Sequence, residues 1–271
     1  MGRTVLIDAD ILAFQIASSQ ETVYEFNGQH VLYSDLVAGQ REVDNAVEHI
    51  ISRLDADHAV MFLTGTSNFR KLVLPSYKAS RTNIRRPMIL SGLRQHLRDT
   101  YLTYEEDILE GDDLMGLHAT MPHKGERVIF SIDKDLKTVP GLHWNADDGE
   151  IVEINQTDAD RMFFEQVITG DATDNYSGCP GAGPAAASDL LDNNVKWERE
   201  VSEYKSGPRR GEEKVSWKKV PCEDAWEQVV SAYLKAGLSE KDALVQARCA
   251  RILRHGEYDF TNKKVNLWKP N

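Results

Sequence analysis

Short apolar runs alternate with amphipathic segments along the chain, which is the pattern of an α/β protein. The runs TVLI (4–7) and HAVMFLTG (58–65) indicate buried strands, and TYLTYEED (100–107) and RVIFSIDKDL (127–136) indicate two more. Helical patterns at residues 11–18 and 112–121 follow two of these strands, and a third helical pattern, at residues 34–54, precedes the strand at 58–65. Strands that alternate with helices predict a mainly parallel sheet, in which ligands bind beyond the carboxyl ends of the strands.

Other segments predict turns and helices around this sheet. The alternation in TVYEFNGQHVLY (22–33) around Asn27-Gly28 predicts a hairpin, and a second one is expected to turn at residues 147–149. Ser34 is expected to cap the helix that runs to about Leu54. A helix over residues 158–169 leads into the glycine-rich stretch GDATDNYSGCPGAG (170–183). From about Asn193 the chain is mixed in charge and contains Gly and Pro, and two helices are predicted after it, at Glu223–Ala236 and from Ser239 to about Leu253.

Composition places the chain among globular proteins. Its 271 residues, 41% of them hydrophobic, are enough to bury a full core. It contains no apolar run of about 18 residues, and its amino terminus lacks the pattern of a signal peptide, so a cytoplasmic protein without a membrane partner is expected. The three cysteines are widely spaced and form no C-x-x-C pair, which favours reduced thiols.

Charge is unevenly distributed. The net charge of −11 argues against a nucleic-acid partner when it is taken as an average. Residues 70–98, however, contain eight Lys or Arg and no Asp or Glu. An ordinary solvated helix mixes both signs, so this basic segment predicts a surface that binds anions.

Acidic residues gather where the predicted strands end. Six of them lie at or just after a strand end and are expected on one rim of the sheet: Asp8, Glu110, Asp112, Asp113, Asp133 and Asp135. Asp171 and Asp174 follow at the glycine-rich stretch. Each motif is common by chance in so acidic a chain, and the specificity lies in their combination. Crowded carboxylates raise each other's pKa, and they are relieved by hard divalent cations such as Mg²⁺ or Mn²⁺. Two such ions beside a basic segment predict hydrolysis of a phosphodiester backbone.

The order of LIDAD, NFRKLVLPSYKASR, EGDD, SIDKDL and GDATDNYSGCPGAG over residues 4–191 resembles the flap endonuclease or 5′-nuclease superfamily. This family includes the 5′-nuclease domain of bacterial DNA polymerase I and small bacteriophage 5′-3′ exonucleases, and the chain is most similar to the latter. The resemblance implies a PIN-like α/β domain and two Mg²⁺ ions, for which Mn²⁺ can substitute. It assigns one ion to Asp8, Glu110, Asp112 and Asp113, and the other to Asp133, Asp135, Asp171 and Asp174.

The resemblance also implies how DNA is held. It places a helical arch in the basic segment, with Lys78 and Arg81 as catalytic residues at the scissile phosphate and Tyr77 stacked on a base. Arg70, Arg85 and Arg86 are the further implied DNA contacts. The glycine-rich stretch resembles a helix–turn–helix variant whose backbone follows duplex phosphates, with a K⁺ ion, at Gly178, Gly181 and Gly183. The implied domains are a catalytic domain, residues 1–169, and a duplex-binding helical region with the C-terminal helices, residues 170–271.

The implied function is a 5′-3′ exonuclease or flap endonuclease that acts on DNA or an RNA–DNA hybrid in phage replication and leaves 5′-phosphate products. Two positions depart from the family. Thr64 stands where the family has Asp, and it is expected only to hold a metal-bound water. Ala185 stands where many relatives have a phosphate-binding Lys, so grip on the duplex is expected to be weaker there or to come from Lys196, Arg209 and Arg210.

Three alternatives remain open at this point. A haloacid-dehalogenase-type phosphatase also begins with a strand and D-x-D, but Leu12 and the three-residue spacing of the later aspartates do not fit that family. A PIN-type ribonuclease would not need the glycine-rich stretch. A non-catalytic nucleic-acid-binding module would be weakened by the excess of carboxylates. His118, His123 and His143 are expected to be structural.

Overall fold

The structure is a computed structural model that describes residues 2–144 and 149–270, arranged in two compact units that are each built from separate stretches of chain. The first unit comprises Met1–Phe69, Asn83–Ala159 and Ile252–Asn266, and the second comprises Arg70–Thr82, Asp160–Arg251 and Leu267–Asn271. The domains expected from the sequence are separated by a single boundary after residue 169. The structure instead places residues 70–82 in the second unit and residues 252–266 in the first. A split into a catalytic part and a duplex-binding part stays a prediction.

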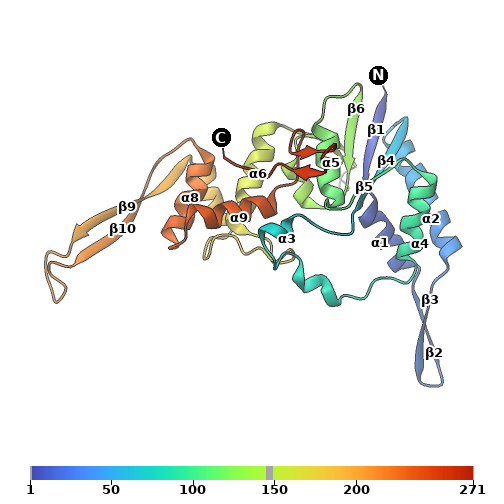
Figure 1. Cartoon of the computed structure of the whole chain (residues 1–271), viewed down its shortest axis with the longest axis horizontal. Coiled ribbons are helices and arrows are strands. Elements are labelled where there is room, and N and C mark those ends of the chain that lie inside the picture. The colour runs from blue at the N-terminus through green and yellow to red at the C-terminus, as the bar shows by residue number, and fades with distance from the viewer. Residues whose placement is uncertain (1, 145–148, 271) are drawn as a thin grey trace. The chain divides into compact units, whose positions relative to one another are not determined.

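A six-stranded sheet organises the first unit (Figure 1). The strand order is β5-β4-β1-β6-β7-β8, and all neighbours are parallel except β7 and β8. The strands are β1 (Arg3–Asp8), β4 (His58–Thr64), β5 (Thr103–Glu106), β6 (Glu126–Phe130), β7 (Gly141–Trp144) and β8 (Ile151–Ile154). The expected mainly parallel sheet is present. The turn expected at residues 147–149 lies largely outside the described residues, although β7 and β8 on either side of it pair antiparallel.

Helices cover both faces of this sheet because side chains of a strand alternate between its faces. Val5 and Ile7 of β1 belong to a core with three helices, α1 (Ala9–Ser19), α2 (Leu36–Arg53) and α4 (Leu90–Thr100). Leu6 between them packs on the opposite face with α5 (Gly111–Thr120) and with the C-terminal segment from Ile252. Central strands buried on both faces account for their continuous apolar sequence.

A separate hairpin follows α1. It consists of β2 (Thr22–Phe26) and β3 (Gln29–Tyr33), and it turns at Asn27-Gly28, whose φ angles are 50° and 75°, as expected. The expected cap of α2 is wrong by one residue. Asp35, not Ser34, accepts hydrogen bonds from the N–H groups of Val37 and Ala38, because a charged carboxylate is at least as good an acceptor at this position as a hydroxyl.

The second unit is mainly helical. Its core gathers around Tyr233, whose hydroxyl donates to the carbonyl of Val167 at 2.6 Å, and around Trp226 and Trp268, whose rings are 5.0 Å apart. Its elements are α3 (Arg70–Val73), a 3₁₀ helix mostly in this unit (Ala79–Asn83), α6 (Gln156–Thr169, which begins in the first unit), α7 (Pro184–Leu191), β9 (Val195–Glu203), β10 (Glu213–Pro221), α8 (Ala225–Lys235) and α9 (Glu240–Ala250).

The β9–β10 hairpin is absent from the sequence expectations. The two nine-residue strands pair from Val195↔Pro221 to Glu203↔Glu213, and Figure 1 shows them as a long ribbon. Alternation of Val and Trp with charged residues is present in VKWEREV and EKVSWKKV, with a GPRRG turn between them. The two-residue period of these strands is obscured by the many charged residues. Both faces of the distal part of the ribbon are exposed, so neither face needs to be apolar.

The C-terminal segment completes the first unit. Leu253 and Tyr258 lie in its core, and β11 (Tyr258–Asp259) pairs with β12 (Lys264–Val265). A Cβ atom on Gly116 of α5 would lie 2.4 Å from the carbonyl oxygen of Leu253, so only glycine permits this close approach. The three cysteines are free thiols, as expected. Over residues 2–144 and 149–270, no helix combines the length and the apolar character needed to cross a membrane.

His118 is a structural residue of α5, as expected. Its ring packs 4.2 Å from Tyr104 and 5.1 Å from Phe62, and burial together with the charge of Arg127 lowers its pKa to about 4. The folded protein favours the neutral ring, whereas the unfolded chain binds a proton with a pKa of 6.5. The contribution of His118 to the free energy of unfolding is therefore complete above pH 6.5 and is lost as the pH falls toward 4.

We expect wild type to lose about 1–2 kcal/mol more unfolding free energy than His118→Phe between pH 7 and pH 5, allowing for partial exposure of the ring. Urea unfolding at both pH values measures the difference. His143 and His123 are unchanged in the variant and serve as the internal control. An equal loss in both proteins contradicts the assignment.

Candidate active site

Two aspartates of the first unit meet at the carboxyl ends of adjacent parallel strands. Asp8 ends β1, and Asp133 follows β6 after a short loop and caps the 3₁₀ helix Lys134–Thr138. The hydroxyl of Ser131 donates to Asp8 Oδ2 at 2.9 Å and accepts the N–H of Asp133 at 3.0 Å. The N–H of Asp135 donates to Asp133 Oδ1 at 2.9 Å. Ser131 therefore holds Asp8 and Asp133 together, and sequence reasoning missed its role.

The environment of Asp8 favours a bound cation. Its side chain is buried and also accepts the N–H of Ile11 at the start of α1. The pKa of Asp8 is raised to about 6, mainly by burial; the hydrogen bonds from Ile11 and Ser131 oppose this rise, and the neighbouring carboxylates of Asp10 and Asp133 add to it. A cation placed among these carboxylates would offset both effects, and hard divalent ions prefer such oxygen ligands.

The motif EGDD forms the beginning of α5. Glu110 is the N-cap and is buried, and Asp112 is half-buried in the first turn, where the helix dipole favours acidic side chains. Asp113 is completely buried: its Oδ2 accepts the N–H of Glu110 at 3.1 Å and its Oδ1 accepts the N–H of Leu253 at 3.2 Å. These hydrogen bonds cap α5 and hold the C-terminal segment, and because each carboxylate oxygen keeps a further lone pair, the expected place of Asp113 as a metal ligand stays a prediction.

Thr64 links the end of β4 to α5. Its hydroxyl accepts the N–H of Gly111 at 3.0 Å, its N–H donates to Asp10 Oδ2 at 2.7 Å, and its carbonyl accepts from Arg94. The expectation that Thr64 only holds a metal-bound water is therefore incomplete, because the hydroxyl already takes part in fixing the helix that carries Glu110 and Asp112.

In the second unit, a tight loop carries Asp171 and Asp174. Asp171 and Tyr176 exchange backbone hydrogen bonds of 2.8 and 3.1 Å, and Asp171 Oδ1 accepts the N–H groups of Thr173 at 2.6 Å and Asp174 at 3.3 Å. Gly170 and Gly178 lie back to back at the two ends of this loop, both with positive φ. A Cβ atom on either would come within 2.4 Å of the backbone nitrogen of the other, so both ends require glycine.

We expect Gly178→Ala to lower the unfolding free energy of the second unit by about 3 kcal/mol, since it combines a left-handed φ with a backbone clash. The control is Gly181→Ala, because Gly181 has a φ of +75° but open space around it, and it should lose only about 1 kcal/mol. Urea unfolding followed by tryptophan fluorescence compares the two, since Trp226 and Trp268 lie in this core. Equal losses would contradict the back-to-back packing.

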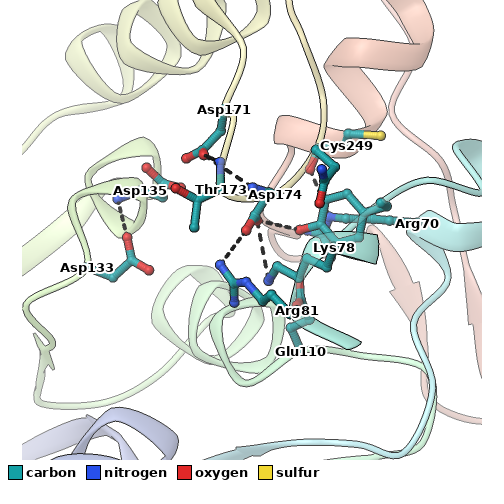
Figure 2. A network of polar contacts seen from close by, with 12 residues as sticks. Arg70, Lys78, Arg81, Glu110, Asp133, Asp135, Asp171, Thr173, Asp174 and Cys249 are labelled. Carbon is teal, nitrogen blue, oxygen red and sulfur yellow. Dashed lines mark hydrogen bonds and ion pairs between the residues drawn. The ribbon is translucent and has the colours of Figure 1, made fainter. Parts of the chain in front are cut away.

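The Asp174 carboxylate collects three donors from the basic segment (Figure 2). Lys78 Nζ lies 3.3 Å from Oδ2, Arg81 donates to Oδ1 at 2.6 Å, and the Tyr77 hydroxyl donates to Oδ2 at 2.8 Å. The backbone of Lys78 has a φ of 53°, and its N–H donates to the carbonyl of Asp174. Two cations are thus fixed beside one predicted metal ligand, and the strained backbone of Lys78 is typical of a functional residue.

Two expected DNA contacts are corrected by burial. The ring of Tyr77 is 2% exposed and stacks parallel to Tyr176 at 6.5 Å, so it cannot stack on a base in this conformation. Arg70 is also 2% exposed, and its guanidinium donates to the carbonyls of Cys249 at 2.9 Å and Arg251 at 2.6 Å. Both residues hold the basic segment in place. Their burial was not visible in the sequence, because Tyr and Arg serve either role.

The remaining basic residues divide into paired and open ones. In the first unit, Arg85 donates with both terminal nitrogens to Glu21, while Arg86 is exposed. In the second unit, Lys196 pairs with Glu227 and Arg209 with Glu212, whereas Arg210 makes no ion pair with any described residue.

The glycines of the glycine-rich stretch differ in what they offer a ligand. The N–H of Gly178 donates to Gln246 Oε1 at 2.9 Å, so it is occupied within the protein. In the part of the chain that the structure describes, the N–H groups of Gly181 and Gly183 have no partner, and nothing lies within 4 Å of a Cβ atom built on either residue. An exposed anion could approach these two amides closely.

No group of three or more His, Cys, Asp or Glu side chains lies close enough to hold a metal among residues 2–144 and 149–270. The predicted ligands nevertheless occur in oxygen-rich sets within each unit: Asp8 with Asp133 in the first, and Asp171 with Asp174 in the second. Such sets suit Mg²⁺, which binds through one or two carboxylates and keeps several waters.

Comparison with known proteins places these observations in context. No protein-family model matches the chain. The exonuclease of Escherichia phage T7 is 34% identical over 98% of this chain and 93% of its own length. The exodeoxyribonuclease of Enterobacteria phage T3 is 33% identical, with 98% and 92% coverage. Among solved structures, the flap endonuclease of bacteriophage T5, in a pseudo-enzyme-product complex with DNA and metal ions, matches with a TM-score of 0.52 at 16% identity, over 71% of this chain and 75% of that chain.

Proposed function

This chain belongs to the flap endonuclease and 5′-3′ exonuclease superfamily, and we propose that it hydrolyses DNA from a 5′ end with divalent metal ions. Its membership of this family, its PIN-like α/β fold with a mainly parallel sheet, and its assignment as a 5′-3′ exonuclease are confirmed. Relatives named as exonucleases over nearly the whole chain leave no support for the phosphatase alternative. The observation that carries the proposed chemistry is the pair of Asp8 and Asp133, joined by Ser131 where two parallel strands end.

The proposed metals are two Mg²⁺ ions, and Mn²⁺ would use the same oxygen ligands. One ion would be held by Asp8, Glu110, Asp112 and Asp113 of the first unit. The other is assigned by the resemblance to Asp133, Asp135, Asp171 and Asp174. Bound there, the ions would supply an activated water and stabilise charge on the phosphate. A K⁺ ion at the glycine-rich stretch remains a further proposal of the resemblance.

The protein's own residues would orient the phosphate. Lys78 and Arg81 are held on the two oxygens of Asp174, so both cations are fixed beside the proposed ligands before DNA binds. Cations held in place in advance stabilise the charge that develops in the transition state without further reorganisation. Arg81, 46% exposed, is the more accessible of the two.

The proposed substrate is DNA with a 5′ end or a 5′ flap, and an RNA–DNA hybrid is the second candidate. The open amides of Gly181 and Gly183 at the start of α7 support a contact with duplex phosphates, because backbone N–H groups at a helix N-terminus favour anions. Arg86 and Arg210 are the exposed cations that would add to it. The products would carry 5′-phosphates, and the role would be in phage DNA replication.

A labelled duplex tests the proposal. The purified protein would be incubated with a 5′-flap duplex labelled at the 3′ end of the flap strand, in Mg²⁺ and in EDTA, and the products sized on a denaturing gel. Shortening that requires Mg²⁺ supports the proposal, with a ladder indicating an exonuclease and one junction product a flap endonuclease. Absence of cleavage in Mg²⁺ and Mn²⁺ at low salt would refute it.

A further inference from the structure

A charged network lies directly beside Asp8 in the first unit. Arg94 Nη1 donates to Asp10 Oδ1 at 2.5 Å, and Asp10 Oδ2 accepts the N–H of Thr64 at 2.7 Å. The side chains of Asp10 and Arg94 are 26% and 21% exposed, so the pair is largely removed from water. Asp10 stands two residues after Asp8 and interacts with its charge.

Both partners of this pair also hold Thr64. Asp10 accepts the N–H of Thr64, and Arg94 Nη2 donates to the carbonyl of Thr64 at 2.5 Å. The Thr64 hydroxyl in turn accepts the N–H of Gly111, the first residue of α5. Asp10 also lies next to Gly111, because a Cβ atom on Gly111 would be in van der Waals contact with Asp10 Oδ2, at 3.6 Å. The pair thereby connects the start of α1, which carries Asp8, with the start of α5, which carries Glu110 and Asp112.

The charges of this network balance. Arg94 has a second, longer contact with Glu105 at 3.4 Å, and Glu105 is bound more closely by Arg98, at 2.7 and 3.1 Å. Arg98 therefore neutralises Glu105, and Asp10 is the carboxylate left to neutralise Arg94. Without Asp10, a cation in a partly buried site would remain uncompensated near the carboxylates proposed to bind metal.

We propose that Asp10 and Arg94 are positioning residues of the metal site, which hold Thr64 between α1 and α5 and keep the net charge next to Asp8 at zero. In this proposal Asp10 acts through Arg94 and the Thr64 N–H, which its two oxygens bind, and not as a ligand. Removing Asp10 would leave the positive charge of Arg94 uncompensated, and this charge would weaken metal binding by repelling the cation. Removing Arg94 as well would restore much of it.

The test measures metal binding in the absence of DNA. It depends on the proposed function in one respect, namely that the wild-type protein must bind metal. Mn²⁺ binding would be followed by electron paramagnetic resonance for wild type, Asp10→Asn, Arg94→Met and the double variant. We expect Asp10→Asn to weaken Mn²⁺ binding about tenfold, as one uncompensated charge at short range would do, and the double variant to return to within about threefold of wild type.

Matched controls separate positioning from loss of fold. Glu105→Gln removes the more distant partner of Arg94 and leaves Arg98 without its carboxylate; because Arg98 is more exposed than Arg94 and its charge is better screened by water, Mn²⁺ binding should weaken much less than in Asp10→Asn. Arg94→Lys keeps the positive charge, but the single ammonium group cannot contact both Asp10 and the Thr64 carbonyl as the guanidinium does. We therefore expect it to retain Mn²⁺ affinity while kcat on the flap duplex falls about tenfold. Thermal unfolding of the metal-free proteins shows whether each variant is folded. If Asp10→Asn is unfolded, the kcat of Arg94→Lys decides between the outcomes.

The outcomes distinguish the two proposals. If wild type binds no Mn²⁺, the proposed function fails and this inference fails with it. If wild type binds Mn²⁺ but folded Asp10→Asn binds equally well, or the double variant binds no better than Asp10→Asn, only the positioning role is overturned. Unchanged kcat in Arg94→Lys overturns it as well.

Discussion

The Asp112→Asn variant is expected to lose DNA cleavage by about a thousandfold or more, while its affinity for a 5′-flap duplex stays within about threefold of wild type. Asp112 lies half-buried in the first turn of α5, beside the N-cap Glu110. The amide has nearly the same shape as the carboxylate, so no cavity forms, but it lacks the charge that a divalent ion requires. Loss of a negative charge does not weaken the attraction of DNA phosphates.

Single-turnover cleavage in Mg²⁺ gives the rate, and fluorescence anisotropy in EDTA gives the affinity. The control is Glu42→Gln, which removes an exposed carboxylate of α2 in the same unit and should change neither value. Full activity in Asp112→Asn would exclude this residue from the metal site and contradict the proposed ligand set.

The Lys78→Ala variant is expected to lower kcat about a hundredfold with little change in DNA affinity. The Lys78 side chain is only 18% exposed, and its ammonium is fixed at 3.3 Å from Asp174 by a backbone in a left-handed conformation. A cation so enclosed adds little to general attraction for DNA, and it acts where charge develops on the phosphate. Removing it therefore affects the chemical step.

Lys71→Ala is the matched control, because Lys71 is exposed on α3 in the same basic segment. It should reduce affinity slightly and leave kcat unchanged. Kinetics at varied substrate concentration separate the two effects. If Lys78→Ala raises KM with kcat unaltered, Lys78 contributes to binding alone.

The sequence predicts the sheet well because its strands are buried on both faces. Continuous apolar runs such as that of β4 have few other interpretations, and in a parallel sheet their carboxyl ends meet at one edge. This reasoning placed Asp8 and Asp133 correctly in relation to each other. It could not identify Ser131, since a lone serine after a strand has no distinctive pattern.

Roles that depend on burial could not be read from residue types. Asp113 follows the motif as well as Asp112 does, and only the C-terminal segment, about 140 residues later, shows that its carboxylate is enclosed. Arg70 and Tyr77 lie in a basic segment that suggests DNA contacts, whereas carbonyl groups of α9 and the region after it occupy Arg70. The partner of Arg94 was equally hidden, because Asp10 is 84 residues away in the chain.

The hydrogen bond from the Leu253 N–H to Asp113 determines the order in which the first unit can be completed during synthesis. As the ribosome releases the chain, β1 must wait for β6 before its second edge is paired, and Asp113 must wait until residue 253 has emerged. Until then the Asp113 carboxylate, which is buried in the folded protein, lacks the N–H of Leu253, and closing so long a loop is entropically slow. A chain that stops before this point would hold an incomplete first unit.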